Sequence, residues 1–175
     1  MGGSLLLWIT LALVVFWSVG VYNRLMRMRA RGLGALGSVM KHMRVYAELM
    51  RSHGAPSPAA APEAGEVATL LTSLQAFEQL LKDATASALM QSSPAALGQA
   101  FDAVHRAWRA VTDTLQQTGS ATPAILREQL ELAALRVGTA RDGFNQLLTK
   151  YNQALEQFPA SLVVTTMGFK PGDML

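Results

Sequence analysis

The sequence predicts an all-α protein, in which an N-terminal transmembrane helix continues into an antiparallel up-and-down four-helix bundle with long helices. Residues 1–23 contain no Asp, Glu, Lys, Arg or His. Beyond them the apolar residues recur every three or four positions, which is the period of an amphipathic helix. The short apolar run at 162–166 has no second strand to pair with. Four helices with short connections favour a bundle.

The uncharged run at residues 4–22 is close to the roughly 20 residues that a helix needs to cross a bilayer. The alternative is a cleaved signal peptide, which requires a basic segment before the run and small residues at the cleavage site. The residues before the run carry no basic side chain, and Val19, Val21 and Tyr22 are bulky. We therefore expect residues 1–23 to hold a short external N-terminus and an uncleaved transmembrane helix.

Four arginines follow the apolar run directly: Arg24, Arg27, Arg29 and Arg31. The positive-inside rule therefore places the N-terminus outside and the rest of the chain in the cytoplasm. Residues 24–51 carry seven basic residues against one acid, Glu48. Because this cluster lies beside the membrane and lacks interleaved stacking aromatics, we expect the four arginines to bind anionic lipid headgroups, and we expect no nucleic acid.

The remaining elements follow from the apolar period and its breaks. A basic juxtamembrane first bundle helix is expected at 24–51, and a Pro/Ala-rich loop at 52–66. The remaining bundle helices fill 67–158, with hydroxyl-and-proline start signals at Ser93-Pro94 and Thr122-Pro123. The last of them, 123–158, would span roughly 54 Å at 1.5 Å per residue, so only a long first helix could cover its seam. Residues 159–175 form a C-terminal tail.

One glycine motif matches the spacing of a known cofactor-binding loop. Gly32, Gly34 and Gly37 fit the spacing of a dinucleotide-binding loop, which requires a preceding strand and an acidic residue about twenty positions later. Here the motif follows a predicted transmembrane helix and four arginines. We therefore expect small residues that permit close helix packing or a local bend, and no cofactor.

The titratable residues predict no reaction and no metal site. His42 and His105 are expected on polar helix faces and His53 in the loop, and none has a partner at metal-ligand spacing. Glu128 and Glu131 are expected on the solvated face of the last helix. The sequence therefore predicts no catalytic residue, no metal ligand and no small-molecule substrate.

An aromatic-Asn dipeptide occurs three times, at Tyr22-Asn23, Phe144-Asn145 and Tyr151-Asn152. The last two are one heptad apart, so their aromatics are expected along the seam of the last helix with the asparagines beside it. An amide near a seam can hydrogen-bond across helices and fix their register. We interpret Asn145 and Asn152 as register-setting residues rather than a ligand site.

These residues resemble the LemA family. The opening Tyr22-Asn23 after a transmembrane helix is similar to the start of family members, and the C-terminal order is similar to their closing signature: Arg141, Phe144-Asn145, Tyr151-Asn152, Phe158-Pro159 and Gly168-Phe169. Residues 39–46 lack the Pro-Asn motif that members usually carry soon after the opening Tyr-Asn, so the chain resembles a divergent member. The resemblance implies a bacterial, membrane-anchored four-helix bundle and no enzymatic activity.

Together these observations predict a single-pass protein of the bacterial cytoplasmic membrane that is not an enzyme. We expect a scaffold or adaptor for membrane-proximal proteins, with membrane lipid and an unidentified protein as partners. The faces of the second and third bundle helices, or the tail at 160–175, are the expected docking surfaces. The sequence is also compatible with a homo-oligomer. The alternative is a sensor or regulatory subunit that signals through a change of helix register.

Overall fold

The computed structural model describes residues 2–54, 64–86, 94–119, 122–157, 164 and 168–175. These contain α1 (Gly2–Leu49), the π-helix η1 (Met50–Gly54), α2 (Ala64–Ala86), α3 (Pro94–Gln117) and α4 (Ala124–Glu156). The described ranges include no strand, so the all-α prediction is confirmed. The chain forms two compact units. The first unit comprises Met1–Gly34 and Asn145–Gly172, and the second comprises Ala35–Phe144 and Asp173–Leu175.

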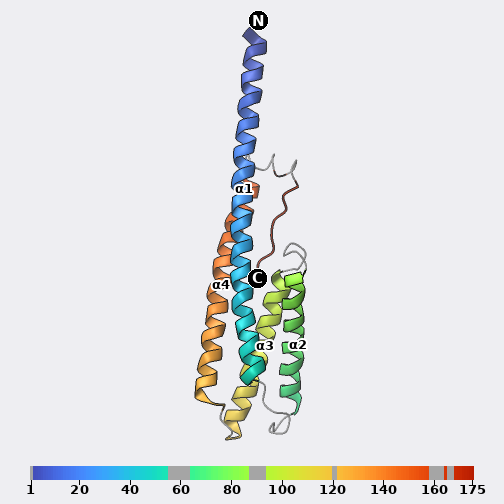
Figure 1. Ribbon diagram of the computed structural model, residues 1–175, viewed down its shortest axis with the longest axis vertical. Coiled ribbons are helices and arrows are strands. Elements are labelled where there is room, and N and C mark those ends of the chain that lie inside the picture. The colour runs from blue at the N-terminus through green and yellow to red at the C-terminus, as the bar shows by residue number, and fades with distance from the viewer. Residues whose placement is uncertain (1, 55–63, 87–93, 120–121, 158–163, 165–167) are drawn as a thin grey trace. The chain divides into compact units, whose positions relative to one another are not determined.

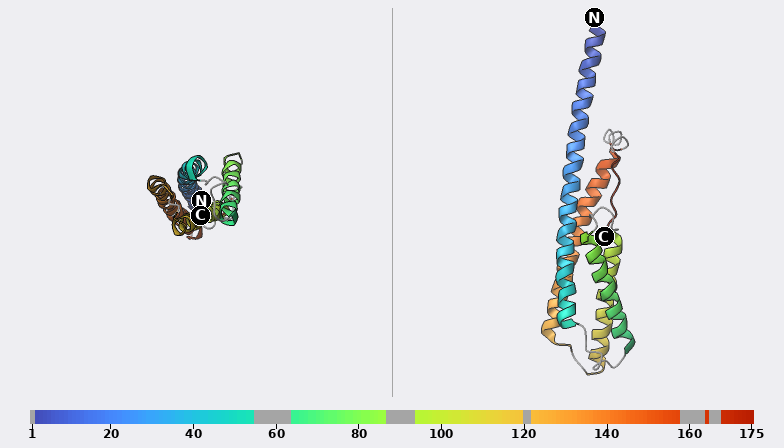
Figure 2. Two further views of the ribbon diagram at one scale, coloured as in Figure 1. Left: turned by 90° about the horizontal axis from the view of Figure 1, so that it is seen from below. Right: turned by 45° about the vertical axis from the view of Figure 1, so that its right-hand side comes forward.

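The second unit is a four-helix bundle in which each helix runs antiparallel to the one before it (Figure 1). The end of α1, all of α2 and α3, and the start of α4 lie side by side in it (Figure 2). Five of the six predicted seam positions of α3 are buried: Leu97, Phe101, Val104, Trp108 and Val111. The sixth, Leu115, is only partly covered. Because the apolar period matches the helical repeat, this face packs inward along its whole length.

An aromatic cluster ties three helices of this bundle together. The ring of Phe101 on α3 lies 5.0 Å from that of Tyr46 on α1 and 5.9 Å from that of Phe77 on α2. Tyr46 and Phe77 have no exposed surface. Such tilted and edge-on ring pairs contribute roughly 0.5–1.5 kcal/mol each beyond the apolar area they bury. The cluster is therefore a principal source of the bundle's stability.

The helix ends differ from the predicted ones by a few residues. The first bundle helix continues past residue 51 through η1, because the Ser52 hydroxyl donates to the Glu48 carbonyl at 2.7 Å and occupies a carbonyl that the helix end leaves open. α2 begins at Ala64 instead of residue 67, with Glu66 in its first turn, where a negative charge favours the helix N-terminus. α2 is described as far as Ala86, and the residues that follow it, 87–93, lie outside the described ranges.

The two predicted proline starts have different outcomes. Pro94 is the first residue of α3, as expected, and Ser93 lies outside the described residues. α4 begins at Ala124, because the carbonyl of Pro123 already accepts the amides of Leu126 and Arg127. The predicted cap at Thr122 is wrong: its buried hydroxyl has no hydrogen-bond partner among the described residues. The cap position falls on Pro123, one residue later than predicted.

The first unit contains an apolar helix that is exposed on all sides. α1 is long and apolar enough to cross a membrane, with a mean hydropathy of 2.2 over its most apolar stretch, and no residue of that stretch is buried. Phe16 is 81% exposed. A helix that is apolar on every face and uncovered by protein is the pattern of a membrane span. The N-terminal helix required by the predicted anchor is therefore present.

The glycine motif lies inside α1, with helix on both sides of it. A Cβ added to Gly32, Gly34 or Gly37 would meet nothing within 4 Å. Of the two predicted roles, close packing is therefore wrong for the described residues, because the space around these glycines is open, and the local bend stays a prediction. The surrounding helix also lacks the strand-to-helix turn that a dinucleotide loop requires.

Candidate functional site

The first unit contains a C-terminal segment whose position could not be predicted from the apolar period of the sequence. Residues 168–172, here called the tail, run beside α1 and α4 (Figures 1 and 2). The side chain of Asn152 on α4 donates to the carbonyl of Gly172 at 3.1 Å and accepts its amide at 3.0 Å. The hydroxyl of Tyr151 donates to the carbonyl of Lys170 at 3.3 Å. Two neighbouring side chains of α4 therefore hold the tail by its backbone.

Glycines shape the tail where it meets the helices. Gly168 has a φ of +68°, a conformation that other residues rarely adopt. A Cβ on Gly172 would lie 2.6 Å from Cδ1 of Leu148, so any other residue there would have to displace the end of the Leu148 side chain. Burial under the tail raises the pKa of Tyr151, and the nearby Arg29 acts in the opposite direction.

The tail also reaches the end of the apolar run on α1. The ring of Phe169 meets that of Tyr22 edge-on, with 5.7 Å between centroids. Residues from the two ends of the chain that resemble family motifs thus come together: Tyr22, Tyr151, Asn152, Gly168 and Phe169. Asn23 is exposed on α1. Phe158 and Pro159 lie outside the described residues, and Arg141 and Phe144 belong to the second unit.

The predicted lipid-binding arginines follow Tyr22 on α1. Arg24, Arg27 and Arg31 are exposed and, with Met28, line an open hollow of about 450 Å³. Arg29 is partly covered and lies close enough to influence the Tyr151 pKa. Three of the four arginines therefore share one concave surface directly after the apolar run, and the fourth faces the Tyr151 side.

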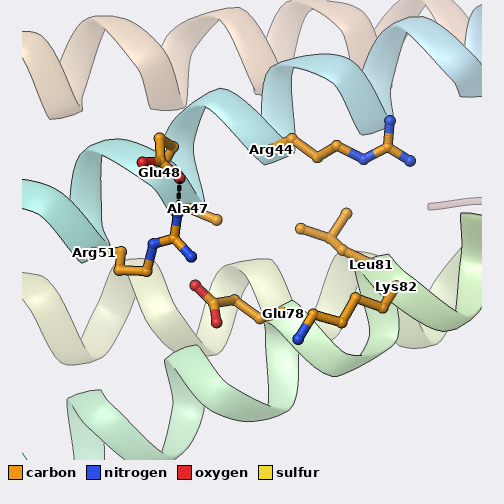
Figure 3. Close-up of a pocket in the computed structure, with 7 residues that line it drawn as sticks. All are labelled: Arg44, Ala47, Glu48, Arg51, Glu78, Leu81 and Lys82. Carbon is orange, nitrogen blue, oxygen red and sulfur yellow. Dashed lines mark hydrogen bonds and ion pairs between the residues drawn. The ribbon is translucent and has the colours of Figure 1, made fainter.

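The second unit carries a groove between α1 and α2 (Figure 3). Its volume is about 480 Å³, and seven residues line it: Arg44, Ala47, Glu48, Arg51, Glu78, Leu81 and Lys82. Ala47 and Leu81 form an apolar floor, and charged side chains surround it. Arg51 pairs with Glu48 on the same helix. The rim thus has three basic and two acidic groups, and one of the acids is already paired.

The histidine at 105 lies in a different environment from the predicted one. His105 on α3 is partly buried, and its Nδ1 lies 3.2 Å from the hydroxyl of Tyr46, which donates to it when the neutral imidazole carries its proton on Nε2. Burial lowers the pKa of His105, while the nearby Glu131 raises it to a smaller extent. Burial also raises the Tyr46 pKa above its usual range. The expectation of a polar face for His105 is therefore wrong.

Charges on α3 and α4 form ion pairs between these helices. Arg109 lies 3.3 Å from Glu131, and Arg141 lies 3.0 and 3.1 Å from the two carboxylate oxygens of Asp102. Glu131 is thus an interhelical partner rather than only a solvated charge. In the described ranges no three His, Asp or Glu side chains lie close enough to hold a metal ion.

Sequence reasoning missed the docked tail. The register role predicted for Asn152 does not match its hydrogen-bond partner in the structure, which is a tail glycine rather than another helix. The available signal was an asparagine in a buried region of α4 combined with two glycines in the last ten residues. Asn145 accepts the Thr149 hydroxyl through its backbone carbonyl, and the prediction of its role in register stays a prediction.

Comparison with protein families gives one match. The LemA family matches residues 77–175, which is more than half of the chain and includes Arg141, Tyr151, Asn152 and Phe169. No curated protein and no solved structure matches the chain. The matched range contains α3, α4 and the docked tail, whereas Tyr22, the arginine hollow and the α1 side of the groove lie outside it. The chain belongs to the LemA family.

Proposed function

We propose that the protein is a non-catalytic scaffold or adaptor held at the bacterial cytoplasmic membrane by α1. The observation that carries the proposal is the exposed apolar stretch of α1 followed at once by arginines. An apolar helix without protein cover is stable only in lipid. The LemA family is not a known enzyme family, which supports a role in binding. Tethering raises the effective concentration of the bundle for partners at the same surface.

The arginines support an orientation as well as a location. Arg24, Arg27 and Arg31 stand at the end of the span where anionic headgroups lie, and each basic residue near such a surface contributes about 1 kcal/mol. The positive-inside rule then places the start of α1 outside and the second unit in the cytoplasm. Residues after the span therefore meet cytoplasmic partners.

Orientation can be tested directly because the chain contains no cysteine. A Lys41→Cys variant places one thiol on the exposed surface of α1 after the arginines. In intact cells a membrane-impermeant maleimide should not label it, and labelling should appear after permeabilisation. Labelling of intact cells would reverse the proposed orientation.

The groove between α1 and α2 is the proposed docking surface. Its apolar floor at Ala47 and Leu81 suits one apolar side chain, and the basic excess on its rim favours an acidic neighbour on that partner. The proposed occupant is therefore a protein segment that has an apolar anchor flanked by acidic residues. The groove includes one face of the second bundle helix, which is among the expected docking surfaces, and the docking role of the tail at 160–175 stays a prediction.

Co-purification in mild detergent tests the scaffold role. The full-length chain should retain a stoichiometric partner that is lost when residues 1–23 are deleted, because the partner is concentrated at the membrane. An Arg44→Glu variant should release the partner, since it reverses a charge on the groove rim. Lys41→Glu makes the same charge change on the exposed surface of α1 outside the groove and should retain it.

Two results would contradict the proposal. Equal loss of the partner with both charge reversals would show that net charge, and not the groove, holds it. A partner-free protein that populates two conformational states would favour the sensor alternative, which requires such states.

A further inference from the structure

Two segments that are far apart in the sequence meet at the end of the apolar run. Tyr22 is the last residue of the uncharged run on α1, and Arg24 is the first charge after it. At 1.5 Å per residue these two positions differ by only about 3 Å along the helix axis. The Tyr22 ring is the one that Phe169 contacts. The tail therefore reaches the level on α1 where apolar side chains give way to cations.

The tail is held at this level by specific contacts. Tyr151 fixes the carbonyl of Lys170, and Asn152 fixes both backbone groups of Gly172. Gly172 also packs directly against the end of the Leu148 side chain on α4. Phe169 and Lys170 are therefore presented at a defined position beside α1.

The exposed groups at this position combine two kinds of chemistry. Phe169 is partly exposed beside Tyr22, and Lys170 is exposed. Arg24, Arg27 and Arg31 line their hollow on α1 within the same unit. Aromatic rings next to basic residues are typical of the boundary between lipid tails and headgroups. No acidic residue occurs between positions 1 and 47 or between 157 and 172, and Glu156 and Asp173 lie just outside the second range, so basic residues predominate around the tail.

We propose that the tail is a second membrane contact, in which Phe169 enters the lipid interface beside Tyr22 and Lys170 joins the arginines at the phosphates of anionic phospholipids. The proposal rests on the anchoring of α1 described under Proposed function. The proposed ligand of the tail is an anionic bilayer surface, because the basic charge of the tail is complementary to such a surface. The tail also lies next to Tyr22, at the end of the membrane span. The membrane would then hold the chain through two segments rather than one.

Depth-dependent quenching tests the proposal on the full-length chain in phosphatidylglycerol-containing bilayers. A Pro171→Cys variant keeps Phe169 and Lys170 and carries one fluorophore on an exposed tail position. A quencher attached near the lipid headgroup should reduce its emission at least twofold. Leu11→Cys, within the span, should respond to a quencher deep in the acyl chains. Gln146→Cys, exposed on α4 about 7.5 Å before Tyr151 along the helix, is the matched control and should respond to neither.

Two further variants separate the apolar and the charged contribution. In the Pro171→Cys background, Phe169→Ala should reduce the quenching. Lys170→Glu should reduce it in bilayers with phosphatidylglycerol and leave it unchanged in pure phosphatidylcholine. Circular dichroism melts of both variants distinguish a released tail from an unfolded protein.

The outcomes separate the tail proposal from the anchor on which it rests. Quenching at Leu11 without quenching at Pro171 would overturn the tail contact and leave the anchor intact. Absence of quenching at both sites would overturn the anchor as well. A Pro171 label that is shielded only when a co-purified protein is present would show that the tail binds protein instead of lipid.

Discussion

The two units of this protein are held together in different ways. Among the described residues, nine of the ten largest fully buried side chains belong to the second unit, and Leu25 is the one in the first. The second unit therefore has a conventional hydrophobic core. Among its described residues the first unit buries a smaller apolar set, Leu25, Leu148, Tyr151, Ala154 and Leu155, and a ring pair and hydrogen bonds join its tail to the helices. The comparison indicates that stability resides in the bundle, while the first unit is built for contact with its surroundings.

The largest expected effect comes from the aromatic cluster of the second unit. Phe77→Ala removes a ring with no exposed surface and should lower the free energy of unfolding by roughly 3–5 kcal/mol. Phe16→Ala removes the same ring from the exposed span and should change the free energy by less than about 0.5 kcal/mol. Denaturant unfolding in detergent measures both. Equal losses would show that the span packs against protein.

Glycine substitutions should act in opposite directions within the first unit. Gly172→Ala places a methyl group against Leu148 and should speed hydrogen exchange of the tail amides by about tenfold or more. Gly34→Ala enters open space on α1 and should stabilise that helix by up to about 1 kcal/mol. Hydrogen exchange of the two variants makes the comparison. Unchanged tail exchange in Gly172→Ala would show that the tail is not held by its contact with α4.

How much the sequence predicts also differs between the units. The seam of α3 follows from its apolar period, because position in a helix determines which side chains face inward. His105 was misplaced because it adjoins Val104 at the edge of that seam, where the period alone does not separate a polar face from the core. Residues 168–172 show no periodic apolar pattern that would predict their docking. The docking depends on backbone contacts with Asn152, and a sequence pattern does not show which backbone groups an amide will reach.

Acid should weaken the second unit through His105. Burial lowers its pKa below the ordinary 6.5, so the unfolded chain binds a proton more readily than the folded one. Stability is therefore complete above pH 6.5, falls as the pH drops below that value, and levels off below the folded pKa. Urea unfolding at several pH values measures this slope. His105→Gln should remove the His105 part of it, and His53→Gln, at an exposed position, should leave it unchanged. An unaltered slope in His105→Gln would assign the effect to other groups.

The smallest effect is expected for the ion pair of Arg109 and Glu131. Both side chains are largely exposed, so a double-mutant cycle should give a coupling below about 1 kcal/mol that declines as salt is added. Asp102 and Arg141 are the matched pair between the same helices.

The Asp102–Arg141 pair should show the larger coupling, because Arg141 is only 27% exposed and contacts both carboxylate oxygens. A larger coupling for Arg109 and Glu131 would contradict this order. The Glu131→Ala variant of the same cycle also reports on His105. Since Glu131 raises the His105 pKa in the folded state, removing it should extend the acid-dependent loss of stability to lower pH and make the total loss larger, while the loss still begins near pH 6.5. A charge pair that contributes little to stability would thus still set the lower limit of the pH range in which the bundle weakens.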